Sequence, residues 1–377
     1  MYIGVVGLKP IATEFGITRG IGSLPYAFFM IGFGIGNIIH GRIGDRYGTI
    51  VPALIGSATL PLGLILSAQT EALWHFFLIF AIFSGMLGAS GVFTPIIADI
   101  SHWFTKRRGL AVAIVLSGSY FGGALWPPII QYLIDETGWR STFQTIGYFC
   151  LATMIPLSLL LYRRPPYLDW DDDKNNAGSF TRPLGLAPNV LQCLLCFAGI
   201  GCCVGMAMPQ VHIVAYSSDL GYTTQRGAEM LSIMLACGGI SRLVSGWISD
   251  RVGGIRTLLV GSGLQILVLT TFLFADSITA LYIISACFGL SQGGIVPSYA
   301  IIIRSYFPPG EAGWRIGATL FFTLIGMAFG GWVAGFLYDI TGSYTISFIN
   351  ALGFNVLNFL IVAGLLARES RHKSIAI

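Results

Sequence analysis

The sequence predicts an all-α integral membrane protein made of two six-helix bundles, and three observations support this fold class. The chain has 377 residues, of which 54% are hydrophobic and only 10% are charged, whereas soluble domains carry about 25% charged residues. Apolar runs recur along its whole length, and one charged motif occurs twice, 205 residues apart. So few charges cannot cover the surface of a water-soluble protein of this size, which excludes an ordinary cytoplasmic enzyme.

Eleven apolar stretches are long enough, or nearly so, to cross a bilayer, which takes roughly 20 residues in a helix. Ten of them contain no Asp, Glu, Lys or Arg, and the other holds only Arg242. They are too long for membrane strands, and they lack the alternation that such strands need. The stretches are Ile21–Ile39, Val51–Ala68, Leu73–Ile97, Gly109–Ile134, Ser141–Tyr162, Asn189–Ser218, Met230–Ile248, Thr257–Ala275, Ser277–Ile303, Ile316–Tyr338 and Ile340–Ala367.

The distribution of Lys and Arg predicts the orientation in the membrane. If the connection after Ile39 is cytoplasmic and the sides alternate, 16 of the 21 basic residues are cytoplasmic and 4 are outside. Basic residues accumulate on the cytoplasmic side of membrane proteins. We therefore expect the C-terminus and the polar segment after Tyr162 to be cytoplasmic.

The first residues do not form a full span. Met1–Phe15 has a short apolar run before Lys9 and Pro10, and it lacks the basic start and apolar core of a signal peptide. It reads as the outer end of a helix whose first half is missing. We expect translation from an upstream start to add about 20–30 residues, which completes a span.

Two pairs of matching motifs indicate that the chain is an internal repeat. Gly41–Gly48 and Gly246–Gly253 both read Gly-x-x-x-Asp-Arg-x-Gly, and Asp135 and Asp339 lie in similar segments 204 residues apart. Residues 162–188 form the only long polar segment between the copies and have the composition of a linker. The sequence therefore predicts an N-terminal bundle over 1–161, a cytoplasmic linker over 162–188 and a C-terminal bundle over 189–377, with the first helix truncated.

This repeated motif resembles that of the major facilitator superfamily, and the resemblance covers the whole chain. His102–Ala111, Gly138–Arg140, Val211–Val214, Arg242–Gly246 and Tyr338–Tyr344 further resemble the bacterial branch of monocarboxylate porters and oxalate/formate exchangers. The resemblance implies a 12-helix transporter fold and small organic anions, often moved with a proton, in a central cavity. It also implies a location in the bacterial inner membrane.

The repeated motif is itself a candidate functional element. Its glycines permit close approach, and its aspartates are able to accept bonds from a neighbouring helix start and pair with arginines. One interpretation is a latch that holds the outward-facing state, which the resemblance favours, and the other is a static loop anchor. The residues are Gly41, Asp45, Arg46, Gly48, Gly246, Asp250, Arg251 and Gly253.

Arg242 is the strongest candidate for the substrate site. An arginine at bilayer depth costs roughly 2.5–3.5 kcal/mol on insertion scales, so such residues usually face a cavity or a partner. Guanidinium binds carboxylate through two parallel hydrogen bonds, and Gly238 leaves room for an anion one turn away. The alternative is that Arg242 extends to the nearby cytoplasmic surface. In the resembled branch this helix carries a substrate-binding arginine at this offset. The animal porters also have an acidic residue at the position of Gly238, so their proton-carrying pair is absent here.

Three further residues are candidates for the cavity. Tyr120 lies in a glycine-rich helix middle, Tyr299 lies at comparable depth in the second half, and His212 lies near the outer end of its helix. Each is able to hydrogen-bond a carboxylate, and His212 is able to hold a proton. Packing is an equally open interpretation for His212 and a slightly favoured one for each tyrosine.

The sequence thus predicts a secondary transporter for a small organic anion, monocarboxylate-like, that works by alternating access. Proton symport is the preferred coupling, with a counter-ion as the other choice. An efflux transporter for a more apolar compound is the alternative, and an integral-membrane enzyme or receptor is a distant one. Neither a metal nor a cofactor is expected, because the cysteines lie in apolar runs without further ligands. We expect no nucleic-acid partner, and a monomer in the lipid bilayer.

Overall fold

The computed structural model describes residues 2–103, 108–162, 183–275 and 277–375. Every regular element in these ranges is a helix. In the first half these are α1 (Tyr2–Val6), α2 (Leu8–Glu14), α3 (Arg19–Tyr47), α4 (Ile50–Ala68), α5 (Leu73–Ile79), η1 (Phe80–Ala89), α6 (Ser90–Trp103), α7 (Arg108–Leu159) and η2 (Leu160–Tyr162). In the second they are η4 (Pro183–Gly185), α8 (Pro188–Asp219), α9 (Thr224–Val252), α10 (Gly254–Phe272), α11 (Ile278–Gln292), α12 (Ile295–Tyr306), α13 (Pro309–Thr341) and α14 (Thr345–Ile375).

The described helices account for the predicted spans. Ten of them, some continuing across a short break, are long and apolar enough to cross a membrane. The longest run, Ile114–Tyr162, contains two predicted spans, because the chain turns at Gly138, where φ is 80° and ψ is 163°. Only glycine adopts this backbone readily. The eleven predicted stretches are therefore found in helical runs that are long and apolar enough to cross a membrane.

The repeat is visible in the backbone as well as in the sequence. Gly48 ends α3 with φ 84° and ψ 166°, and Gly253 ends α9 with φ 87° and ψ 160°. The last glycine of each repeated motif is thus a helix stop that requires a positive φ. Gly138 and Gly342, in the second pair of matching segments, also have positive φ values.

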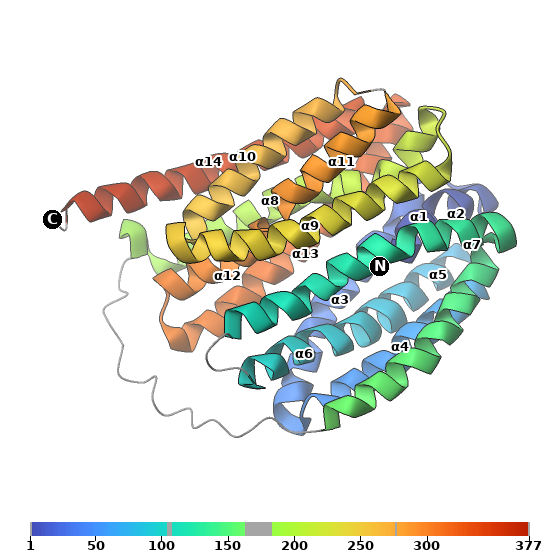
Figure 1. The fold of residues 1–377 in the computed structure, drawn as a ribbon, viewed down its shortest axis with the longest axis horizontal. Coiled ribbons are helices and arrows are strands. Elements are labelled where there is room, and N and C mark those ends of the chain that lie inside the picture. Colours follow the sequence, from blue (N-terminus) through green and yellow to red (C-terminus); the bar gives the residue numbers. More distant parts are fainter. Residues whose placement is uncertain (1, 104–107, 163–182, 276, 376–377) are drawn as a thin grey trace.

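The two halves lie side by side, with α3–α7 in one and α8–α14 in the other (Figure 1). We use "N-terminal half" for residues up to 161 and "C-terminal half" for residues from 189. Across the boundary, α3 packs on α13 and α7 packs on α9. These two pairs join equivalent positions of the repeat, so the interface has an approximate two-fold arrangement.

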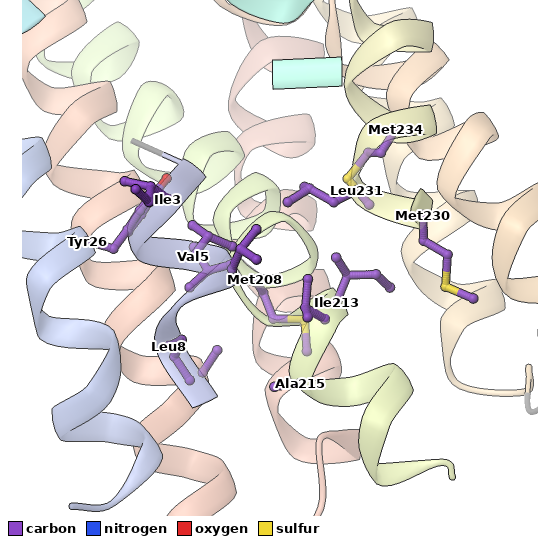
Figure 2. Close-up of a cluster of buried hydrophobic side chains, with 14 of the residues drawn as sticks. Ile3, Val5, Leu8, Tyr26, Met208, Ile213, Ala215, Met230, Leu231 and Met234 are labelled. Carbon is purple, nitrogen blue, oxygen red and sulfur yellow. The ribbon is translucent and has the colours of Figure 1, made fainter. Parts of the chain in front are cut away.

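The residues expected to be a helix fragment fold as two short helices, α1 and α2, which touch both halves. Ile3, Val5 and Leu8 are buried there. Figure 2 shows them gathered with Tyr26 of α3 and with side chains of α8 and α9, among them Met208. The segment therefore fills the core between the halves.

The span that begins at Leu73 is not a regular α-helix. Its middle, η1, is a π-helix, a wider turn that is rare and occurs mostly in short stretches. Helix α3 packs closely on it through glycines. A Cβ atom added to Gly36 would lie 2.1 Å from the Met86 carbonyl oxygen and 2.4 Å from Ser90 Oγ. Close backbone approach through small residues is a common way for helices to associate in lipid.

We therefore expect Gly36→Ala to lower the thermal unfolding temperature of the detergent-purified protein. The methyl group must push α3 away from η1, and such overpacking costs about 1–3 kcal/mol. Gly353→Ala is the matched control, because no atom of the described residues lies within 4 Å of a Cβ atom added there. Equal unfolding temperatures for the two variants would contradict the close packing.

The orientation is testable by cysteine labelling in a cysteine-free background. Glu71 is exposed between α4 and α5, and Lys174 lies in the linker, outside the described residues. An impermeant maleimide added to intact cells should label Glu71→Cys and should label Lys174→Cys only after lysis. Labelling of Lys174→Cys in intact cells would overturn the predicted orientation.

Candidate functional site

Arg242 lies on the face of α9 that packs against α7 of the other half. Its guanidinium carbon is 4.5 Å from the centre of the Tyr120 ring, and Nη1 is 3.5 Å from the Leu116 carbonyl oxygen. Its Nε is buried and has no hydrogen-bond partner among the described residues. A cation over an aromatic face is attracted by the ring. The side chain therefore points across the boundary between the halves.

Small residues on α9 bring Tyr120 to this cation. A Cβ atom added to Gly238 would lie 2.6 Å from Tyr120 Cε1, and one added to Gly239 would lie 3.3 Å from Tyr120 Cβ. The space that the sequence suggested for an anion beside Gly238 is thus filled by the Tyr120 ring in this conformation. Of the predicted site residues, the structure brings Tyr120 together with Arg242.

His212 and Tyr299 have partners elsewhere, within the C-terminal half. Both ring nitrogens of His212 are occupied, Nδ1 by the Tyr344 hydroxyl at 3.1 Å and Nε2 by the Gly331 carbonyl at 2.8 Å. The Tyr299 hydroxyl donates to Asn358 Oδ1 at 3.0 Å. Both side chains are completely buried, and the structure does not bring them to Arg242, so their role as cavity residues stays a prediction.

A glutamine pair near Arg242 was not singled out from the sequence. Gln210 of α8 donates its amide Nε2 to Oε1 of Gln292, at the end of α11, over 2.6 Å. Gln292 Nε2 is buried without a partner among the described residues. The sequence does contain a feature that points to this pair, because each glutamine is a polar residue within an apolar run at membrane depth.

The repeated motif combines a glycine stop with arginines that contact rings. Arg46 lies over the ring of Tyr47 and Arg251 over that of Trp247, with carbon-to-centre distances of 5.3 and 3.5 Å. The Asp45 side chain lies outside the described residues. The charge latch expected from Asp45 and Asp250 therefore stays a prediction.

The outer end of the molecule, opposite the predicted cytoplasmic side, holds a second charged cluster. Arg19 at the start of α3 forms a two-pronged ion pair with Asp219 at the end of α8, with Nη2 2.6 Å from Oδ1. Its guanidinium also donates to the Tyr344 hydroxyl at 3.1 Å and lies 3.9 Å from the centre of the Tyr338 ring. This cluster joins the N-terminal half to α8, to α13 and to the turn between α13 and α14.

Asp339 contributes a different contact to the same cluster. Its carboxylate accepts the backbone N–H groups of Arg19 and Gly20 at 2.8 and 2.6 Å. These are the free donors at the N-terminus of α3, where a negative charge is favoured. We call Arg19, Asp219, Asp339 and Tyr344 the outer clasp.

Asp135, the equivalent of Asp339 in the first half, is linked to a helix start of the other half indirectly, through a glutamine. Gln131 Nε2 donates both to Asp135 Oδ1 at 2.8 Å and to Thr224 Oγ1, at the start of α9, at 3.0 Å. The paired aspartates of the repeat thus both lie where one half meets a helix start of the other. Lys9 Nζ adds a further link to Ser218 Oγ at 2.5 Å.

A pocket of about 240 Å³ lies away from this boundary, among α9, α10, α11 and the start of α12. Its rim consists of exposed apolar residues such as Ile240, Val260 and Leu264. Such a surface suits contact with lipid tails. The pocket lining does not include Arg242 or Tyr120.

Comparison with known proteins decides the family. The sequence model of the Major Facilitator Superfamily matches residues 1–313 and, in a second overlapping match, residues 230–376. The chain belongs to the Major Facilitator Superfamily. Its fold agrees, because the crystal structure of the nucleoside transporter NupG superposes with a TM-score of 0.68, 14% identity, and 97% and 95% coverage of the two chains. The all-helical fold of about twelve helices is thus confirmed, as is the expectation that the protein is no enzyme.

Two curated relatives from the superfamily cover most of the chain. Monocarboxylate transporter 13 of Bos taurus is 27% identical over 337 residues, which are 89% of this chain and 76% of that protein. The MFS-type transporter opdF of Penicillium oxalicum is 28% identical over 328 residues, 86% and 74% of the two chains. The superfamily and a likeness to monocarboxylate transporters agree with the sequence analysis. These relatives come from an animal and a fungus, so they do not support the narrower expectation of a bacterial branch.

Proposed function

We propose that this secondary transporter moves a small monocarboxylate-like anion by alternating access, coupled to a proton. The observation that carries the proposal is Arg242, a permanent cation that faces the boundary between the halves and whose Nε has no hydrogen-bond partner in the described part of the chain. A cation at membrane depth is costly, and a carboxylate offers Arg242 two parallel charge-assisted hydrogen bonds. The name of the monocarboxylate transporter relative supports the same substrate class.

Tyr120 and Arg242 suggest how binding is linked to motion. The ring belongs to the N-terminal half and the cation to the C-terminal half, and in this conformation the ring covers the cation. We infer that rocking of residues 1–161 against 189–377, joined by the linker 162–188, withdraws the ring and admits the anion. In the observed structure the outer clasp holds the outer ends of the two halves together. We therefore infer that this structure corresponds to a state closed to the outside.

The residue at position 238 bears on the coupling ion. Gly238 occupies the place of the acidic residue found in the animal porters that the chain resembles. An aspartate–arginine proton pair is therefore not the basis of coupling at this position. Exchange against a counter-ion is the alternative.

Uptake into proteoliposomes tests the proposal. Purified protein is reconstituted and offered labelled monocarboxylates, with and without an inward proton gradient. We expect saturable uptake of at least one acid, increased by the gradient. Saturable uptake at the same rate with and without the proton gradient would overturn the proposed proton coupling but not the proposed substrate class. A protein that moves no acid but exports an apolar compound would favour the efflux alternative.

A further inference from the structure

We propose that Gln292, oriented by Gln210, is a second substrate-binding residue that selects acids with an oxygen acceptor next to the carboxylate. The proposal rests on the carboxylate function proposed for Arg242. It adds a specificity-determining contact that comes from α11 and not from α9.

The first argument is the unmet hydrogen-bonding capacity of Gln292. Its side chain is 1% exposed, yet Nε2, which carries two N–H donors, has no partner among the described residues. A buried donor without an acceptor raises the free energy of the folded protein. A ligand that supplies the acceptor recovers this free energy, which makes an orphaned donor at a binding site a basis for selectivity.

The second argument is that the orientation of the amide is fixed. Gln210 is also buried, and its Nε2 donates to Gln292 Oε1 at 2.6 Å. The oxygen of Gln292 is thereby engaged, and its nitrogen is the end that remains available. A donor that is already oriented loses less rotational freedom when it binds.

The third argument is position. A Cβ atom added to Gly238 would lie 3.5 Å from Gln292 Nε2 and 2.6 Å from Tyr120 Cε1. The free amide nitrogen of Gln292 and the Tyr120 ring therefore both lie next to Gly238, which is one helical turn from Arg242. When Tyr120 withdraws, the unpaired donors of Arg242 and Gln292 become accessible together.

Arg242 and Gln292 are suited to bind different groups of the same substrate. The guanidinium fork satisfies both carboxylate oxygens. The amide is then left for a further acceptor, such as a 2-oxo oxygen. A plain aliphatic acid leaves the amide unpaired and binds less tightly.

The test compares butyrate with 2-oxobutyrate on detergent-purified protein. Affinity is taken from the concentration dependence of the shift in thermal unfolding temperature, since ligands that bind only the folded state stabilise it. We expect Gln292→Met to weaken 2-oxobutyrate binding about tenfold, as loss of about 1.4 kcal/mol predicts, and to leave butyrate within about twofold. Gln210→Met should act in the same direction, less strongly, because it frees the amide to rotate.

Gln265→Met is the matched control. Gln265 is also fully buried, and its amide has no hydrogen-bond partner among the described residues. It lies on α10, which packs chiefly on helices of its own C-terminal half and not on α7, the helix that carries Tyr120. It should leave both affinities unchanged. Equal weakening of both acids by Gln292→Met, or no weakening, would overturn the inference while the carboxylate function stands. If the wild-type protein binds neither acid, the proposed function itself fails, and the inference fails with it.

Discussion

Arg242→Ala is expected to abolish saturable anion uptake while the protein still inserts and folds. The change removes the only charge within the predicted membrane spans, so insertion becomes easier. It also removes the fork that binds the carboxylate. Arg242→Lys keeps the charge but presents a single ammonium in place of a planar pair of donors. We therefore expect the Arg242→Lys variant to keep residual transport, with its affinity for the acid weakened about tenfold or more. This weakening corresponds to the loss of at least one charge-assisted hydrogen bond.

The measurement is uptake of labelled acid into proteoliposomes containing equal amounts of each variant. Arg226→Ala is the matched control, because Arg226 lies on the same helix but pairs with Glu229 three residues on, in an exposed position. It should transport at the wild-type rate. Wild-type uptake by Arg242→Ala would show that the arginine is structural, and apolar efflux would become the better explanation.

Asp339→Asn is expected to release the outer clasp and shift the protein toward an outward-open state. The neutral amide no longer provides the negative charge that accepts the two N–H groups at the start of α3. Hydrogen bonds to charged groups contribute about 1.5–3 kcal/mol each, and about 1.4 kcal/mol is a tenfold change in an equilibrium. The outward-open population should therefore rise by about tenfold or more.

Labelling of a buried interface position reports this shift. Met208→Cys, in a cysteine-free background, is buried in the core between the halves (Figure 2). An impermeant maleimide applied from outside should react with it about tenfold faster in the Asp339→Asn variant. Arg226→Ala again serves as the control, because it removes a charge at the outer end of the protein but leaves the outer clasp intact. An unchanged rate with Asp339→Asn would mean that the cluster is not what keeps the outer end closed.

Several features of the fold could be predicted because they depend on local sequence. The apolar runs gave the spans, since each helix in lipid needs about the same length of apolar residues. The repeat of Asp45 at Asp250 predicted two related halves, and the matching glycine stops at Gly48 and Gly253 agree with it. Arg242 was found because a charge at bilayer depth is rare enough to require a reason.

The sequence by itself thus determined where the helices are, how the chain repeats and which charge matters. Only the tertiary structure decided what each polar side chain faces: Arg242 toward Tyr120, Gln292 toward the same boundary, and His212 toward Tyr344. The physical reason is that a membrane helix is apolar on its lipid side and on its packed side alike. Its sequence therefore does not reveal which side faces the other half. That orientation is set by close packing between helices distant in the sequence, such as the contact of Tyr120 with Gly238.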